Sequence, residues 1–232
     1  MHWVFYNSSV KEDLWPAGIE EAKELQRVLK ERVKITPLKR TPEFIAAADA
    51  AFSDELVFAS ATLYRLQGLI CEKNSLAKGR IKFPYVPGLL AFREGNVIIE
   101  AIRRLPVSPG VILIDGQGIA HPEGIGIASH VGVVMNIPTV GCAKSRLVGE
   151  YQEPGHAKGD WSYLYYNGVK VGAVLRTRRN VKPLFISPGH LMDIESSVEI
   201  IMMCVSGYRI PEPLRTADRL SRRVRRDYSE GL

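Results

Sequence analysis

Hydrophobic positions in the first third of the chain change from a helical to a strand-like spacing. Between residues 19 and 33, apolar side chains recur every three or four positions among Glu, Lys and Arg, which predicts an amphipathic helix. From residue 44 onward the pattern predicts three successive strands, at residues 44–52, 56–64 and about 68–81. Ser53 and Asp54 make the first connection short enough for an antiparallel hairpin.

Helical and strand-like segments alternate over the rest of the chain. The aliphatic run at residues 111–114 is typical of a parallel strand that helices cover on both faces. The other predicted elements are helices at 89–105, 125–135, 194–205 and 213–226, a strand at 139–143, and a hairpin at 161–176 turning at Asn167-Gly168. This order predicts the α/β class, as a mixed sheet flanked by helices on both faces. No repeat or long linker interrupts it, so we expect one domain over residues 1–232, with a basic C-terminal helix or tail at about 213–232.

Positive charge is concentrated near the C-terminal end. The chain has 31 Lys and Arg against 25 Asp and Glu, a formal net charge of +6, and residues 215–226 alone carry six Arg and one Asp. A clustered positive surface attracts phosphates without reading sequence, so a nucleic acid, either DNA or RNA, is a candidate partner. A solvated basic tail explains the same charge, and composition leaves both interpretations open.

Cysteine usage and hydropathy indicate neither a disulfide scaffold nor a membrane protein. The 3 Cys are far apart and form no Cys-x-x-Cys pair, which is typical of reduced core residues. The longest aliphatic stretch, residues 200–205, is far shorter than the roughly 20 residues of a membrane span. Residues 1–6 lack the basic and apolar segments of a secretory signal. We therefore expect a cytoplasmic monomer that contacts no membrane.

Three acidic residues occupy positions that suggest chemistry. Asp115 directly follows the buried run and precedes Gly116-Gln117-Gly118, at the strand end where α/β sheets present active groups. A dinucleotide-binding turn is the competing interpretation, but His121 stands where its third glycine belongs. Asp49 lies among small residues within a predicted strand. It is either a buried carboxylate, which needs a partner, or a bulge residue. Glu94, near the start of a helix, is equally explained as a first-turn acid stabilised by the helix dipole.

Together with Asp218 on the last predicted helix, these acids suggest one convergent carboxylate cluster. Mg²⁺ prefers oxygen ligands and keeps several waters, so three or four carboxylates suit it, with Mn²⁺ as a substitute. Such an ion polarises a phosphoryl oxygen and generates a nucleophile near neutral pH, which indicates phosphodiester hydrolysis. On spacing alone, however, scattered ion-pair partners explain the acids better.

Five stretches of the chain carry linked motifs in a fixed order. They are Phe83-Pro84-Tyr85-Val86-Pro87-Gly88-Leu89-Leu90-Ala91-Phe92-Arg93-Glu94, Asp115-Gly116-Gln117-Gly118-Ile119-Ala120-His121-Pro122, Gly126-Ile127-Ala128-Ser129-His130, Gly141-Cys142-Ala143-Lys144-Ser145-Arg146-Leu147 and Ser187-Pro188-Gly189-His190. Their order and spacing, over roughly residues 15–225, resemble those of the endonuclease V family. The resemblance implies a ribonuclease H-like fold. It also implies an endonuclease that cuts the second phosphodiester bond 3′ to inosine, a deaminated adenine, during DNA repair.

The resemblance also implies which carboxylates hold the metal. Asp49, Glu94 and Asp115 match positions that bind the catalytic magnesium. Asp218 stands where many bacterial members of the family have histidine, and a fourth carboxylate there would favour hard ions such as Mg²⁺ and Mn²⁺. Helical spacing alone leaves Asp218 as an exposed ion-pair partner of a neighbouring arginine.

Two further residues match positions that contact the reacting phosphate or its water, Lys144 and His121. A lysine ammonium can offset charge that develops on a phosphate in a pocket of low dielectric constant. Without the resemblance, Lys144 reads as a solvated loop lysine and His121 as a hydrogen-bonded turn residue.

The remaining matches concern the substrate base. Pro84-Tyr85-Val86-Pro87 resembles a wedge whose aromatic ring fills the gap left by an extruded base, and two prolines would keep that loop rigid. A rigid surface turn is the alternative. Hypoxanthine presents a carbonyl acceptor beside an N–H donor, which main-chain groups can distinguish from adenine. The residues matching that pocket are Gly88, Leu90, Gly126 and Ile127.

The sequence is also compatible with two other functions. An RNA-directed inosine nuclease would use the same fold and metal chemistry, and a pocket for the 2′-hydroxyl would distinguish it. A non-catalytic nucleic-acid-binding relative belongs to a different class, but acids at four separate motif positions argue against it.

Overall fold

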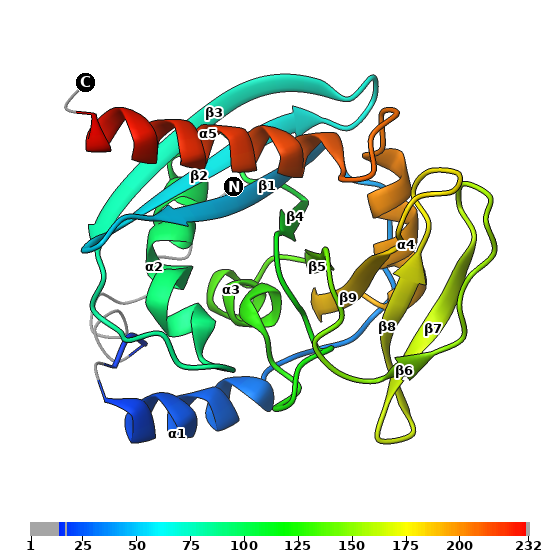
Figure 1. Ribbon diagram of the computed structural model, residues 1–232, viewed down its shortest axis with the longest axis horizontal. Coiled ribbons are helices and arrows are strands. Elements are labelled where there is room, and N and C mark those ends of the chain that lie inside the picture. The colour runs from blue at the N-terminus through cyan, green and yellow to red at the C-terminus, as the bar shows by residue number, and fades with distance from the viewer. Residues whose placement is uncertain (1–13, 17, 231–232) are drawn as a thin grey trace.

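The computed structural model describes residues 14–16 and 18–230, and within them the chain folds around one nine-stranded sheet (Figure 1). The strand order is β3-β2-β1-β4-β5-β9-β8-β7-β6. Its centre is parallel, comprising β1 (Phe44–Phe52), β4 (Val111–Ile114) and β5 (Thr139–Ala143), and all other neighbours are antiparallel. The expectation about a secretory signal concerns residues 1–6, which lie outside the described residues.

The two wings of the sheet are antiparallel hairpins. β1, β2 (Leu56–Arg65) and β3 (Ile70–Arg80) follow one another along the chain, as the sequence pattern predicted. On the opposite wing, β7 (Trp161–Tyr166) and β8 (Val169–Leu175) form the predicted hairpin. Asn167 and Gly168 at its turn have φ values of 51° and 76°, which a type I′ turn requires and which these residues tolerate.

Helices cover both faces of the sheet. α2 (Leu90–Arg103) and α3 (Ile127–Met135) share one core, whereas α4 (Ile194–Met203) and α5 (Glu212–Ser229) lie on the opposite face. α1 (Ile19–Lys30) packs against α3. The predicted mixed sheet with helices on both faces is therefore confirmed. Among the described residues, no helix combines the length and the apolar character that a membrane span needs.

Three features differ from the sequence-based expectation. β9 (Leu184–His190) was not predicted, because Pro188 lacks a backbone donor for the ladder. The sheet accommodates Pro188 opposite Val140, beside a shift in register between β5 and β9. The two-residue strand β6 (Glu150–Tyr151) was too short to give a periodic pattern. Cys71, expected in the core, is exposed on the edge strand β3, whereas the other two cysteines are buried.

Buried hydroxyl groups of β2 fix α5 on the sheet. Ser60 Oγ donates to the Ala217 carbonyl at 2.7 Å, and Thr62 Oγ1 donates to the Pro213 carbonyl at 3.2 Å. The Tyr64 hydroxyl is hydrogen-bonded to a threonine hydroxyl of α5 at 2.9 Å. These alternate residues of β2 point to one face and are all buried. Because hydrogen bonds have narrow distance ranges, they set the register of α5 more sharply than apolar packing does.

The segment that follows β4 packs backbone to backbone against β5 and β9. A Cβ on Gly118 would lie 2.0 Å from the Pro188 carbonyl oxygen, and one on Gly141 would lie 2.4 Å from the Gly118 nitrogen. The Gly118 N–H donates to Ser187 Oγ at 2.7 Å. Only glycine permits such close approach, so these positions fix the path of the chain just after Asp115.

Replacing Gly118 by alanine should therefore destabilise the protein strongly. We expect the free energy of unfolding of Gly118→Ala, measured by urea denaturation, to fall by about 3 kcal/mol, because a backbone carbonyl cannot rotate away from the new methyl group. Gly18→Ala is the matched control, since its Cβ would lie 3.4 Å from the nearest atom. Equal, small changes in both variants would show that the segment after β4 can shift.

Candidate active site

The register of the central strands brings two carboxylates together. β1 and β4 pair in parallel with Ala48 opposite Ile114, so the next residues, Asp49 and Asp115, are neighbours. Along β1, alternate residues face opposite cores, and Asp49 shares the parity of Ala47, which faces α4 and α5. Asp115 has the corresponding parity in β4. Both side chains therefore start from the face that α5 covers. Asp49 pairs regularly with β2, so the bulge interpretation is wrong.

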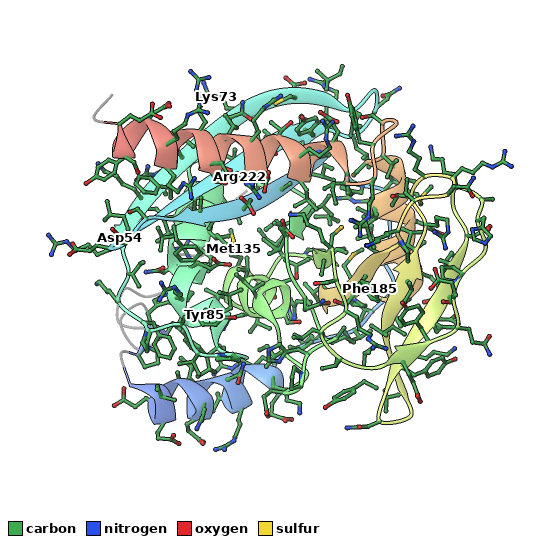
Figure 2. All side chains as sticks on the ribbon, viewed as in Figure 1. Asp54, Lys73, Tyr85, Met135, Phe185 and Arg222 are labelled. Carbon is green, nitrogen blue, oxygen red and sulfur yellow. The ribbon has the colours of Figure 1, made fainter. Side chains whose placement is uncertain are left out.

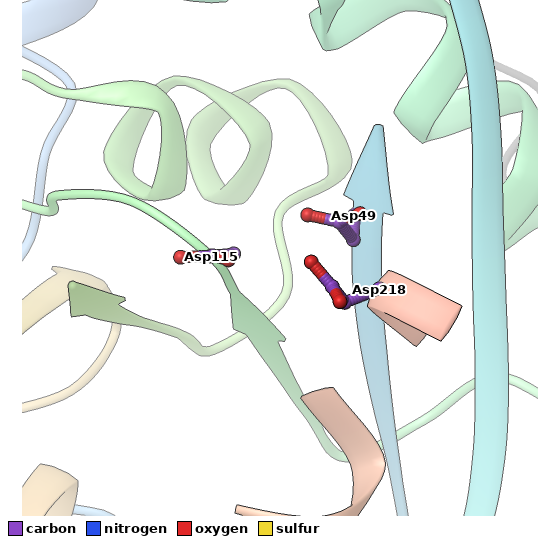
Figure 3. A group of neighbouring side chains, drawn as sticks. All are labelled: Asp49, Asp115 and Asp218. Carbon is purple, nitrogen blue, oxygen red and sulfur yellow. The ribbon is translucent and has the colours of Figure 1, made fainter. Parts of the chain in front are cut away.

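Asp218 of α5 completes a group of three carboxylates (Figure 3). One carboxylate oxygen from each of Asp49, Asp115 and Asp218 lies within 4.8 Å of the others, and all three residues are half-buried. The group unites a central strand, the end of its parallel neighbour and a helix more than 100 residues further along the chain. All its donors are carboxylate oxygens, which suits a hard divalent cation such as Mg²⁺ or Mn²⁺.

Basic side chains balance this negative charge. The Lys144 ammonium forms an ion pair with Asp115 and lies 4.0 Å from Asp218. Arg222 lies one turn after Asp218 on α5 and pairs with it at 2.9 Å. Lys144 is thus not the freely solvated loop lysine of the alternative interpretation. Asp218 is an arginine partner, as helical spacing suggested, and also a member of the carboxylate group.

Side chains that the sequence analysis did not identify hold these groups in place. Ser221, fully buried on α5, donates to Asp49 Oδ2 at 2.5 Å. Behind Lys144, Arg209 Nη2 donates to the Lys144 carbonyl at 2.9 Å, and Gln117 Nε2 donates to the Ser145 carbonyl at 3.2 Å. Serine, arginine and glutamine are common on any surface, so only their placement distinguishes them. Such outer contacts orient the residues that would hold an ion.

The environment changes the pKa values of the group. The pKa of Asp49 is raised to about 6, chiefly by burial and further by the nearby Asp115 and Asp218 carboxylates, against the opposing effect of the hydrogen bond from Ser221. For Lys144, burial favours the neutral amine, but the hydrogen bond and charge of Asp115 outweigh it and raise the pKa. The ammonium therefore stays protonated at neutral pH, and Asp49 ionises less readily than an ordinary aspartate until a cation balances its charge.

Glu94 lies outside the group of three carboxylates. It is in the second turn of α2, which covers the opposite face of the sheet, and only 6% of its surface is exposed. The first-turn interpretation is therefore wrong, because α2 begins at Leu90. Burial, together with the negative charges of Asp49 and Asp115, raises the pKa of Glu94 to about 8, so Glu94 lies close behind these two residues. Without a cation, Glu94 is protonated at neutral pH.

His121 is placed with the predicted base pocket rather than with the three carboxylates. Its ring lies 3.7 Å from the point where a Cβ on Gly88 would be. Its Nδ1 accepts a hydrogen bond from the Glu123 N–H at 3.2 Å, and burial lowers its pKa. His121 is therefore a neutral imidazole whose other nitrogen can contact a polar group.

Gln26 of α1 links the two loops that contain the predicted pocket residues. Its Nε2 donates to the Gly88 carbonyl at 2.8 Å and to the Ile125 carbonyl at 3.4 Å. Leu90 and Ile127 begin the helices that follow these loops. Gln26 was not identifiable from the sequence, because a glutamine on an amphipathic helix gives no distinctive signal.

Gly126 has a structural function that the pocket interpretation did not include. Its N–H donates to the Gly118 carbonyl at 2.8 Å, and its carbonyl accepts from the His130 N–H at 3.0 Å. A Cβ there would lie 2.3 Å from the Gln117 carbonyl oxygen. The glycine at this position is therefore required for close packing of backbones, and both of its polar groups are already hydrogen-bonded.

The loop of Tyr85 projects from the surface between β3 and α2. The Tyr85 side chain is labelled in Figure 2, and 69% of the residue is exposed. Pro84 and Pro87 are also exposed, whereas Val86 packs beside the buried Phe83. The loop thus has an apolar anchor and presents one aromatic ring outward.

A family model, curated relatives and solved structures each match most of the chain. The family model described as Endonuclease V matches residues 27–219. Endonuclease V of Geotalea uraniireducens is 44% identical over 213 residues, which cover 92% of this chain and 91% of the relative. The crystal structure of the endonuclease V from Streptomyces avermitilis has a TM-score of 0.89 and 38% identity, covering 93% of this chain and 96% of that chain.

A more distant structure has a ligand. Ciona intestinalis endonuclease V, in complex with a 24-mer DNA that contains an inosine followed by a ribo-adenosine, has a TM-score of 0.77 and 23% identity. It covers 90% of this chain and 98% of that chain, which shows a shared fold.

The raised pKa of Glu94 predicts a pH-dependent cost in stability. A carboxyl whose folded pKa is about 8, against an ordinary value of 4.5, stabilises the fold below pH 4.5 and loses that contribution as the pH rises through 8. Glu94→Gln cannot ionise. In EDTA, its free energy of unfolding should match that of the parent near pH 4 and exceed it by on the order of 2 kcal/mol at pH 9.

Glu100→Gln on the same helix is the control, because Glu100 is exposed and pairs with Arg104 at the surface. Urea denaturation of the parent, Glu94→Gln and Glu100→Gln at pH 4 and pH 9 tests whether ionisation of Glu94 lowers stability. A Glu94→Gln advantage that is as large at pH 4 as at pH 9 would contradict ionisation as the cause.

Proposed function

The chain belongs to the endonuclease V family of nucleases, and we propose that it is a metal-dependent repair enzyme that cuts DNA at the second phosphodiester bond 3′ to a deaminated adenine. The observation that carries this proposal is the convergence of Asp49, Asp115 and Asp218 next to Lys144. Carboxylates grouped beside a cationic side chain suit the hydrolysis of a phosphodiester.

In this proposal Asp49, Asp115 and Asp218 hold a divalent metal ion, Mg²⁺ or in its place Mn²⁺. The ion, when bound, supplies Lewis-acid polarisation of the phosphate and lowers the pKa of water. Ser221 orients Asp49 by its hydrogen bond, which leaves the other carboxylate oxygen free. Glu94, protonated in the metal-free protein, completes the set of acids from the opposite face of the sheet.

Lys144 and His121 act on the substrate in different places. The Lys144 ammonium pairs with Asp115 in the free protein, and a cation bound by the carboxylates would release it toward a phosphate oxygen, where it offsets developing negative charge. His121, a neutral imidazole beside Gly88, would contact the extruded nucleotide or the water and phosphate next to it.

The base would be held between the two loops that Gln26 links. Gly88, Leu90 and Ile127 lie in or directly after these loops, and Gly126 permits their backbones to approach. Tyr85, held outward by its prolines, would fill the gap in a duplex after extrusion of the base. Because the Tyr85 ring is exposed, moving it into the duplex would break few packing contacts.

A second candidate is inosine-specific cleavage of single-stranded RNA. The Ciona protein was crystallised on a strand with a ribonucleotide after the inosine, and the carboxylate group of this chain would serve either backbone. The deciding experiment incubates the protein with matched DNA and RNA strands, with or without one inosine, with and without Mg²⁺, and maps the cut. We expect a metal-dependent cut one nucleotide beyond the inosine's own 3′ phosphate in DNA. Absence of cleavage in every strand would contradict both candidates.

Removing a carboxylate should slow cleavage strongly without unfolding the protein. We expect Asp115→Ala and Asp218→Ala to lower kcat by about 100-fold or more, because each loses a proposed metal ligand. Excess Mn²⁺ should partly restore Asp218→Ala, which keeps two carboxylates of the group. Asp54→Ala, in the turn between β1 and β2, should cleave like the parent. An Asp218→Ala variant with parental activity across a Mg²⁺ titration would make Asp218 a surface ion-pair partner only.

Shortening Tyr85 should affect duplex substrates selectively. Tyr85→Ala should raise KM for inosine in a duplex by about 10-fold but change single-strand cleavage little, because only a duplex leaves a gap to fill. Steady-state kinetics on both substrates test this. Tyr165→Ala, which removes another exposed tyrosine on β7, is the control. Equal losses on the two substrates would argue against a wedge.

A further inference from the structure

The charge on α5 is unevenly distributed between its two edges. Five of its six arginines are exposed. At about 100° per residue, Arg222 and Arg225 lie within about 40° of Asp218, so these three form one edge of the helix. Arg223 lies on the other edge, about 160° from Arg225 about the helix axis.

The two edges also differ in their ion pairs. On the far edge, Asp227 lies 3.5 Å from Arg223, and it also contacts Arg226 at 3.9 Å. On the near edge, Arg222 pairs with Asp218, and Arg225 has no ion-pair partner among residues 14–16 and 18–230. The near edge therefore carries uncompensated positive charge that begins at the carboxylate group.

The buried side of α5 fixes which way the near edge faces. Ser221 reaches Asp49, and Ala217 accepts from Ser60, so the helix cannot rotate without breaking buried hydrogen bonds. In Figure 2, Arg222 and Lys73 are labelled on opposite sides of α5, with Lys73 on the side of β3. The near edge thus borders the reaction site, and the far edge does not.

We propose that the edge formed by Asp218, Arg222 and Arg225, here called the phosphate edge, binds the sugar–phosphate backbone of the substrate strand beside the cleaved bond. The inference rests on the proposed function. From Asp218 to Arg225 the helix rises about 10 Å, which matches about three nucleotides of one strand at 3.4 Å each. Arginine suits this contact because its planar guanidinium donates two parallel hydrogen bonds to a phosphate. DNA and RNA share this phosphodiester chemistry.

Replacing one arginine on each edge of the helix tests the proposal. The variants are Arg225→Gln on the phosphate edge and Arg223→Gln on the far edge, which change net charge equally at exposed positions of one helix. The measurement is fluorescence anisotropy of labelled, inosine-free single strands of DNA and of RNA, with Mg²⁺ present, over a series of salt concentrations. Inosine-free strands report the backbone contact without depending on recognition of the base.

Arg225→Gln should weaken binding several-fold and reduce the slope of log affinity against log salt by about 0.7, the value for one phosphate contact on a single strand. The loss should be the same for DNA and RNA, and Arg223→Gln should bind like the parent. Equal effects of both variants, no effect of either, or a loss confined to one type of strand would overturn the proposal. Cleavage of an inosine-containing strand by the parent is measured alongside. If the parent protein cleaves and Arg225→Gln binds as tightly as the parent, the phosphate edge is rejected and the proposed function stands.

Discussion

The parallel pairing of β1 with β4 is the constraint on which the site depends. It places Asp49 and Asp115 side by side at one position of the sheet, where two like charges repel and burial penalises the charge of Asp49. Much of the surrounding structure reduces that penalty. Lys144 and Arg222 supply positive charge, and Ser221 donates a hydrogen bond to Asp49. A bound cation would complete this compensation, which is why carboxylates so close together indicate a metal site.

The docking of α5 shows how a third carboxylate is placed with the required accuracy. A helix held only by its apolar stripe can slide or roll by small amounts, because apolar contacts have no preferred direction. The buried hydroxyls of Ser60 and Thr62 donate instead to particular carbonyls of α5. These bonds set the register of the helix, so Asp218 meets Asp49 while its basic edge borders the same site. In the proposed function, this one helix would therefore supply a metal ligand, a positioning hydroxyl and a charged surface.

The face of the sheet that α2 and α3 cover contains a different set of polar and backbone contacts. Close backbone packing at Gly118 and Gly126 holds the segment after β4 against the start of α3. Gln26 connects the loops on this side, and His121 lies beside Gly88. The groups proposed to hold a nucleotide base thus lie on one side of Asp115, and the groups proposed to hold a metal and phosphate lie on the other. Such a division lets base recognition and phosphate chemistry meet at one strand end.

Local pattern determined much of the fold. The strands β1 and β2, the buried strand β4 and the turn at Asn167-Gly168 each followed from the pattern of a few neighbouring residues, since periodicity and turn chemistry are local properties. Asp115 was identifiable in the same way, because it directly follows a buried strand. Pro188 concealed β9, since a proline is tolerated there beside a bulge in β9 itself, where the register against β5 shifts.

The tertiary structure alone decided which polar residues act together. Ser221 and Asp49 are 172 positions apart, and Gln26 lies 62 positions from Gly88. It also placed Glu94 behind the group of three carboxylates rather than in it, because α2 and α5 cover opposite faces of the sheet. The physical reason is that a carboxylate or a hydroxyl has the same local preferences whether or not it has a distant partner. Its function depends on where strand pairing and helix docking place that partner.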